Sequence, residues 1–110
     1  MVDNAKSIIA CVGAGRMGRG IAHCFAYAGH EVRLLDAKTR DAGATSTFFE
    51  QTFNEIRGSL KIVSDLGGFD GNAIDGILER VSLFPRSRLE EALTGASIVF
   101  EAVPETEGAK

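Results

Sequence analysis

Residues 8–18 read IIACVGAGRMG, which places an apolar run directly before three glycines at the spacing G-x-G-x-x-G. A helical pattern begins at the last glycine, and a second apolar run ends at Asp36, eighteen residues after Gly18. A buried strand, a glycine turn, a helix and a second strand closed by an acid form the arrangement that binds a dinucleotide. An ordinary glycine-rich turn between a strand and a helix, with no ligand, is the alternative.

Each glycine of this motif has a separate role in the dinucleotide interpretation. Gly13 lets the chain turn sharply out of the strand, where a Cβ atom would clash. Gly15 lets the backbone lie close to a pyrophosphate, and Gly18 lets the helix pack tightly on the sheet. The pyrophosphate would lie at the helix N-terminus, where unpaired N–H groups and the helix dipole favour negative charge. Asp36 would accept hydrogen bonds from the hydroxyls of the adenosine ribose.

The composition indicates one small globular domain. The chain has 110 residues, of which 45% are hydrophobic, and its formal net charge is −3. Such a balance, with no basic cluster, argues against nucleic-acid and membrane-surface partners. The first six residues are polar and the apolar run that follows is short, so we expect no signal peptide, no membrane span and a cytoplasmic protein.

The side chains that most often act as nucleophiles or proton acceptors lie in unpromising positions. Cys11 falls in a predicted strand and Cys24 in a predicted helix, and we interpret both as buried small hydrophobic residues rather than disulfide partners or reactive thiols. His23 lies in the middle of the first predicted helix. His30 lies at the amino end of the second strand, opposite the expected cofactor edge. We therefore expect no catalytic residue and no metal site in this chain.

Strand and helix patterns alternate along the chain. Apolar runs predict strands at residues 7–12, 31–36, 81–84 and 97–103. A first helix, ended by Gly29, is predicted from the spacing of Met17, Ile21, Cys24, Phe25 and Ala28. A longer second helix, whose phenylalanines we interpret as core, is predicted from Thr45, Phe48, Phe49, Thr52, Phe53, Ile56 and Leu60.

Two short helices complete the pattern. Asn72 is expected to cap the first of them, which carries Ile74, Ile77 and Leu78. The segment Ser87-Arg88-Leu89-Glu90 reads as a capping box that opens the second, which ends at Gly95. The order β-α-β-α-α-β-α-β predicts an α/β fold, a Rossmann-type doubly wound parallel sheet with strand order 3-2-1-4. Ligands bind such sheets at the carboxyl ends of the strands, here the glycine loop and residues 102–105.

Three stretches resemble the N-terminal domain of the 3-hydroxyacyl-CoA dehydrogenases: VGAGRMGRGIA at 12–22, GHEV at 29–32, and Leu35-Asp36. EAVPE at 101–105 resembles the segment after that family's fourth strand. The resemblance spans nearly the whole chain, and it implies NAD as cofactor and hydride transfer from the 3-hydroxyl of a hydroxyacyl thioester. It also implies that the catalytic His, its carboxylate partner and the helical substrate and dimerisation domain follow this stretch. Residues 1–110 are then the dinucleotide-binding fragment of a homodimeric enzyme, inactive alone.

The expected cofactor contacts form two groups. One is the glycine loop with the acid: Gly13, Ala14, Gly15, Arg16, Met17, Gly18 and Asp36. The resemblance implies the second group, in which Glu105 lies near the nicotinamide end. Ala102, Val103 and Pro104 precede it, and Lys110 falls where family members often place a cofactor-contacting lysine.

Three alternatives remain open. Arg16, Lys38 and Arg40 could meet the 2′-phosphate of NADP, although Asp36 would repel that phosphate and favours NAD. The family often carries lysines for coenzyme A on the helix after the acid, whereas residues 45–61 offer only Arg57 and Lys61. Gulonate-type dehydrogenases of free hydroxy acids share this fold and stay possible. The third alternative is a non-catalytic module that binds NAD for sensing or structure.

Overall fold

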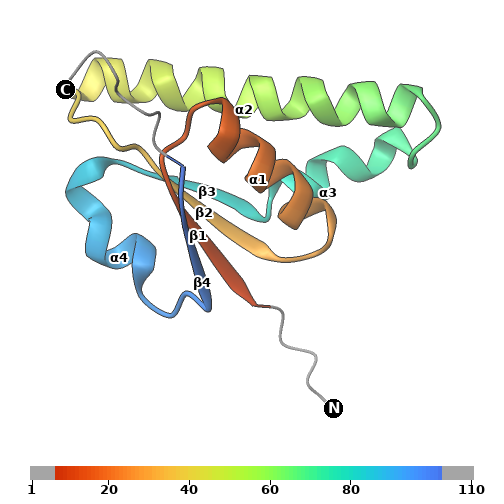
Figure 1. Cartoon of the computed structure of the whole chain (residues 1–110). Helices are drawn as coiled ribbons and strands as arrows, with labels where there is room; N and C mark the ends of the chain where they lie inside the picture. Colours follow the sequence, from red (N-terminus) through yellow and green to blue (C-terminus); the bar gives the residue numbers. More distant parts are fainter. Residues whose placement is uncertain (1–6, 103–110) are drawn as a thin grey trace.

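The computed structural model describes residues 7–102, which form a four-stranded parallel sheet with helices on both faces (Figure 1). The strands are β1 (Ile8–Val12), β2 (Glu31–Leu35), β3 (Val81–Phe84) and β4 (Ile98–Glu101). The helices are α1 (Arg16–Tyr27), α2 (Ala42–Asp65), α3 (Ile74–Leu78) and α4 (Leu89–Leu93). Short 3-10 turns at Gly71–Ala73 and Arg86–Arg88 precede α3 and α4.

The strand order is β3-β2-β1-β4, as predicted, and all three pairings are parallel. Each strand lies within its predicted range and differs by no more than two residues at either end. Helices α1, α2 and α3 lie on one face of the sheet and α4 on the other (Figure 1). This division follows from right-handed crossovers, because the chain moves outward from β1 to β3 and then returns to the far side of β1 to form β4.

The buried face of α1 differs from the predicted one. Gly18, Ala22 and Ala26 point into the core, whereas Met17 is 65% exposed and Cys24 is also exposed. The prediction is correct for Ile21 and Phe25, which are partly buried and pack against the core. It followed the largest apolar side chains, but the helix approaches the sheet most closely through its smallest ones. Small side chains allow this approach because they leave room for the backbones to come close. The interpretation of Cys24 as buried is therefore wrong, while Cys11 is fully buried and its burial raises its pKa to about 11.

Helix α2 begins three residues earlier than its apolar pattern suggested. The side chain of Asp41 accepts a hydrogen bond from the backbone N–H of Ala44 at 2.7 Å, which caps the helix at its start. Most of the predicted apolar face is correct: Thr52, Ile56 and Leu60 are buried, and the partly buried rings of Phe48 and Phe53 pack against the core. Phe49 is half-buried and lies beside Phe48 rather than in the core, so its interpretation as a core residue is wrong.

Both predicted caps of the short helices are wrong. Asp70, not Asn72, caps the turn before α3, and its carboxylate accepts a hydrogen bond from the N–H of Asn72 at 2.9 Å. The expected capping box at residues 87–90 does not form, since a 3-10 turn occupies Arg86–Arg88 and no side-chain bond caps α4. In each case the shorter turn moves the helix start away from the residue that the pattern favoured.

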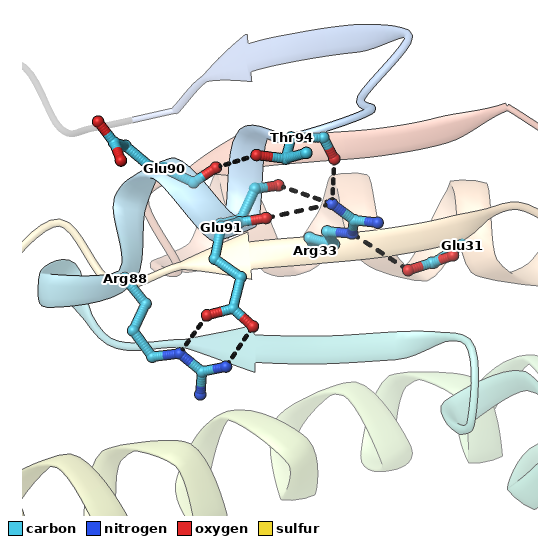
Figure 2. Close-up of polar contacts among 7 residues, drawn as sticks. Glu31, Arg33, Arg88, Glu90, Glu91 and Thr94 are labelled. Carbon is cyan, nitrogen blue, oxygen red and sulfur yellow. Dashed lines mark hydrogen bonds and ion pairs between the residues drawn. The ribbon is translucent and has the colours of Figure 1, made fainter.

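The far face of the sheet is held by a side chain that the sequence patterns did not single out. Arg33 of β2 extends its guanidinium to the end of α4, where Nη1 lies within 3.4 Å of the carbonyl oxygens of Glu91, Ala92 and Thr94 (Figure 2). These carbonyls lie at the C-terminal end of α4, where the last carbonyl groups of a helix have no partner within the helix. A cation at this position also complements the helix dipole. Arg33 therefore fixes α4 to the centre of the sheet.

Two carboxylates surround this contact. Arg33 Nε donates to Glu31 at 3.1 Å, and Arg88 pairs with Glu91 on the outer surface (Figure 2). The hydrogen bond from Arg88 lowers the pKa of Glu91. Both side chains of this second pair are exposed to solvent, so the pair contributes little to stability.

Replacing Arg33 is expected to destabilise the domain. Arg33→Met leaves the terminal carbonyls of α4 without their donor, and we expect the free energy of unfolding to fall by about 1–3 kcal/mol. Urea denaturation followed by circular dichroism measures this loss. Arg57→Met is the control, because Arg57 forms an exposed pair with Asp75 and its loss should cost less than about 1 kcal/mol. Equal losses in the two variants would contradict the assigned role of Arg33.

Two glycines of α1 provide a matched test of close packing. A Cβ atom on Gly18 would lie 2.0 Å from the carbonyl oxygen of Gly13, whereas one on Gly20 would meet no atom within 4 Å in the part of the chain that the structure describes. We expect Gly18→Ala to destabilise the domain by roughly 1–3 kcal/mol or more, because backbone must shift. Gly20→Ala should stabilise it by up to about 1 kcal/mol through helix propensity. Thermal unfolding of both variants checks these opposite signs, and a neutral Gly18→Ala would refute the packing argument.

Candidate nucleotide-binding site

The carboxyl ends of three neighbouring strands meet at one edge of the sheet. Val12 of β1 pairs with Leu35 of β2 on one side and with Glu101 of β4 on the other. The residues that follow them are Gly13, Asp36 and Ala102. Backbone hydrogen bonds keep these ends together, from Gly13 N to the Leu35 carbonyl and from Ala102 N to the Val12 carbonyl, both at 2.8 Å. The predicted loop, the predicted acid and the start of the 102–105 segment are therefore adjacent.

The glycine loop has the geometry that its spacing predicted. Gly13 has a φ of 111°, a conformation that residues with a Cβ rarely adopt. Gly15 lies at the N-terminus of α1, and a Cβ there would meet no atom of the described residues within 4 Å. Because Gly15 has no side chain, it leaves the first N–H groups of the helix without a side-chain cap of its own. The backbone N–H groups at the start of α1 are therefore not covered by a side chain of Gly15.

The remaining loop residues differ in exposure. Ala14 is buried, and its carbonyl oxygen accepts a hydrogen bond from Arg19 Nη1 at 3.4 Å. Arg16 and Met17 form the exposed first turn of α1. A ligand at this helix end would therefore contact main-chain N–H groups flanked by one cationic and one apolar side chain.

Asp36 is only 3% exposed, although it is the predicted ribose acceptor. Its Oδ1 accepts a hydrogen bond from the Lys38 N–H at 3.0 Å, and its Oδ2 accepts one from Arg40 Nε at 2.5 Å. Arg40 also lies over the ring of Phe48, with its Cζ 3.9 Å from the ring centroid. The sequence patterns considered Arg40 only as a partner for a phosphate. Its pairing with Asp36 was missed because residues 37–40 form a loop, where a spacing of four carries no information about contact.

The histidines take no part in this edge. His23 lies two turns into α1, and its Nδ1 is 2.6 Å from Ser59 Oγ of α2. Partial burial lowers the pKa of His23. His30 precedes β2 at the opposite end of the strands, with its ring 5.7 Å from that of Phe25. The prediction that neither is near the cofactor edge is confirmed.

A shallow hollow between α1 and α2 also contains ionisable residues. His23 and Ser59 lie in it, together with the pair of Arg19 and Glu55 at 3.8 Å. Their contacts with one another join the two helices, so helix packing accounts for this group.

Two further predictions concern parts or ligands of the site. Val103, Pro104, Glu105 and Lys110 lie outside the described residues, so their contacts stay predictions. Among residues 7–102, no three His, Cys, Asp or Glu side chains lie close enough together to hold a metal ion.

In the same part of the chain, no helix has the length and apolar character needed to cross a membrane.

Comparison with solved structures gives the same fold. FadB2 from M. tuberculosis matches with a TM-score of 0.74 and 29% identity, over 96% of this chain and 34% of its own. An (S)-3-hydroxybutyryl-CoA dehydrogenase from Ralstonia eutropha matches with a TM-score of 0.72 and 24% identity, over 94% and 33%. A 3-hydroxybutyryl-CoA dehydrogenase from Escherichia coli K12 matches with a TM-score of 0.68 and 30% identity, over 94% and 20%.

Sequence comparison points the same way. The human lambda-crystallin homolog is 28% identical over 106 residues, which are 96% of this chain and 30% of that protein. The chain thus spans about a third of the length of this protein and of FadB2. Residues 8–110 match the family described as "3-hydroxyacyl-CoA dehydrogenase, NAD binding domain". With the strand order, the glycine loop and Asp36 at one edge, this match shows that the chain belongs to the 3-hydroxyacyl-CoA dehydrogenase family, as its NAD-binding domain.

Proposed function

We propose that this chain binds NAD across the carboxyl edge of β1, β2 and β4, and that the protein containing it transfers hydride between NAD and a 3-hydroxyacyl-CoA. The family match and the 3-hydroxybutyryl-CoA dehydrogenase of E. coli support the reaction class. The observation that carries the binding site is the open space beside Gly15, at a helix start next to three strand ends.

The pyrophosphate is proposed to lie against the loop of Gly13, Ala14 and Gly15. Here the N–H groups at the start of α1 would donate hydrogen bonds to its oxygens, and the helix dipole would favour its charge. Gly15 provides the room for this approach, because any side chain at that position would occupy the phosphate's place. Gly18 acts indirectly: it allows α1 to pack on the Gly13 carbonyl, which aims the helix end at the loop.

The two ends of the dinucleotide are proposed to contact different strand ends. Asp36, after β2, would accept the ribose hydroxyls of the adenosine half, with Arg16 and Met17 beside the phosphates. Residues after β4 would contact the nicotinamide half: Ala102, Val103, Pro104, Glu105 and Lys110. The orientation of the dinucleotide, with its adenosine half at β2 and its nicotinamide half at β4, follows from the strand order, since β4 lies on the side of β1 away from β2.

When bound, NAD would supply the hydride acceptor. Oxidation of an alcohol also needs a proton acceptor near the reacting carbon, and His is the usual one. Neither histidine of this chain lies at the cofactor edge. We therefore propose that the proton acceptor, the substrate pocket and the dimer contacts lie beyond these 110 residues, in the part by which the relatives are longer.

One observation favours an alternative substrate, a free hydroxy acid. Arg57 and Lys61 are the basic residues that α2 could offer to coenzyme A, and both are paired with carboxylates. Arg57 contacts Asp75 at 2.9 Å and Lys61 contacts Asp65 at 3.3 Å. Steady-state assays of the full-length protein with 3-hydroxybutyryl-CoA and with free 3-hydroxybutyrate distinguish the two substrates.

Filling the space beside Gly15 is expected to abolish NAD binding without unfolding the domain. Gly15→Val places methyl groups where the pyrophosphate would lie, and a Cβ there meets no atom of residues 7–102 within 4 Å. Gly20→Val is the control, since it also enters open space but lies one turn further along α1. Calorimetric titration with NAD should show binding for Gly20→Val and none for Gly15→Val. Unchanged affinity in Gly15→Val would refute the assigned loop.

Recognition of the nicotinamide half separates a dehydrogenase domain from a simple adenine-nucleotide module. We expect the 110-residue chain to bind NAD about tenfold or more tightly than AMP, since residues after β4 add contacts that AMP cannot make. We also expect no hydride transfer from 3-hydroxybutyryl-CoA by this chain. Titration and NADH absorbance measure the two quantities. Equal affinities would favour the module, and turnover would show that the chain holds its own proton acceptor.

A further inference from the structure

The acid proposed to bind the ribose is already hydrogen bonded within the protein. Asp36 has its two carboxylate oxygens engaged by the Lys38 N–H and by the guanidinium of Arg40, whose Nη2 also lies 3.4 Å from Oδ1. Only 3% of the residue is exposed. A ribose diol needs direct contact with these same oxygens. It can therefore reach Asp36 only if Arg40 moves aside or shares the carboxylate.

Arg40 is held where a ligand's adenosine end would lie. Its guanidinium lies between the Asp36 carboxylate and the ring of Phe48. The next residue, Asp41, caps α2 and thereby fixes the chain that follows the arginine. The side chain is 24% exposed, so one side of the guanidinium remains accessible to solvent.

The pair changes the electrostatics of the ribose subsite. An unpaired carboxylate repels the 2′-phosphate of NADP and leaves the hydroxyls of NAD as preferred donors. Here the arginine compensates the carboxylate charge. Arginine has several N–H donors in a planar fork, and those not facing Asp36 can hold a second anion. The same side chain therefore opposes NAD and attracts a 2′-phosphate.

We infer that Arg40 determines the cofactor specificity of this domain: it competes with the ribose of NAD for Asp36 and offers a cation to the 2′-phosphate of NADP. Discrimination between NAD and NADP is consequently weak in the natural sequence. This inference rests on the proposed dinucleotide site and assigns the residue that controls its selectivity.

The test compares dissociation constants for NAD and NADP in the natural chain, in Arg40→Met and in Arg86→Met. Arg86 is a matched control, because it is exposed and donates to the Ala37 carbonyl at 2.8 Å in the same region without contacting Asp36. We expect Arg40→Met to raise the preference for NAD over NADP by about 10- to 100-fold, the effect of one charge-assisted hydrogen bond. Arg86→Met should change it by less than about threefold.

The outcomes separate this inference from the site on which it rests. If the natural chain binds neither dinucleotide, both the proposed site and the role of Arg40 are wrong. If it binds NAD and Arg40→Met shows the same preference as Arg86→Met or the natural chain, only the role of Arg40 is wrong. Arg40→Lys adds a check: it keeps the charge but loses the fork, so NADP binding should persist while NAD binding improves.

Arg40→Met leaves the buried Asp36 carboxylate without its cation, which lowers the stability of the domain. A second measurement therefore uses the natural chain alone, which is titrated with 5′-AMP and with 2′,5′-ADP. These two ligands differ only by the 2′-phosphate. We expect their affinities to agree within about tenfold at low salt, with the 2′,5′-ADP affinity falling more steeply as salt is added. A loss of about 100-fold or more for 2′,5′-ADP would overturn the inference.

Discussion

The contact between α1 and the turn after β1 determines the architecture around the proposed site. Gly18 lies against the carbonyl of Gly13, so closely that a single Cβ would overlap that oxygen. The approach continues along the helix through Ala22 and Ala26, which are fully buried. Because the helix lies this close to the sheet, its N-terminus lies beside the carboxyl ends of the strands. The open space at Gly15 is a consequence of this placement.

The parallel register supplies the other half of the site. Strands β2 and β4 flank β1 and end level with it, although more than sixty residues separate them in sequence. Because both pairings are parallel, all three carboxyl ends lie at one edge. Chain segments that follow these ends can then contact a single extended ligand. The arrangement explains why a dinucleotide, with two polar ends and a charged centre, suits the edge better than a compact metabolite.

Two arginines pair with polar groups that folding removes from water. Arg33 compensates the terminal carbonyls of α4, and Arg40 compensates the nearly buried carboxylate of Asp36. The first contact is structural, since it lies at a helix end on the far face of the sheet. The second lies within the proposed ligand site, where a partner for the carboxylate is also a competitor for its ligand. The same chemistry thus has different consequences because of where the fold places it.

Local patterns in the sequence determined the strands, their order, the glycine loop and the acid after β2. Each of these depends on neighbouring residues: apolar runs, glycine positions and the end of a run. Tertiary structure decided what depends on distant partners. Met17 and Cys24 are exposed because α1 packs on the sheet through Gly18, Ala22 and Ala26. Arg40 bonds to Asp36 because a loop folds back beside Phe48, and no periodicity reports the path of a loop.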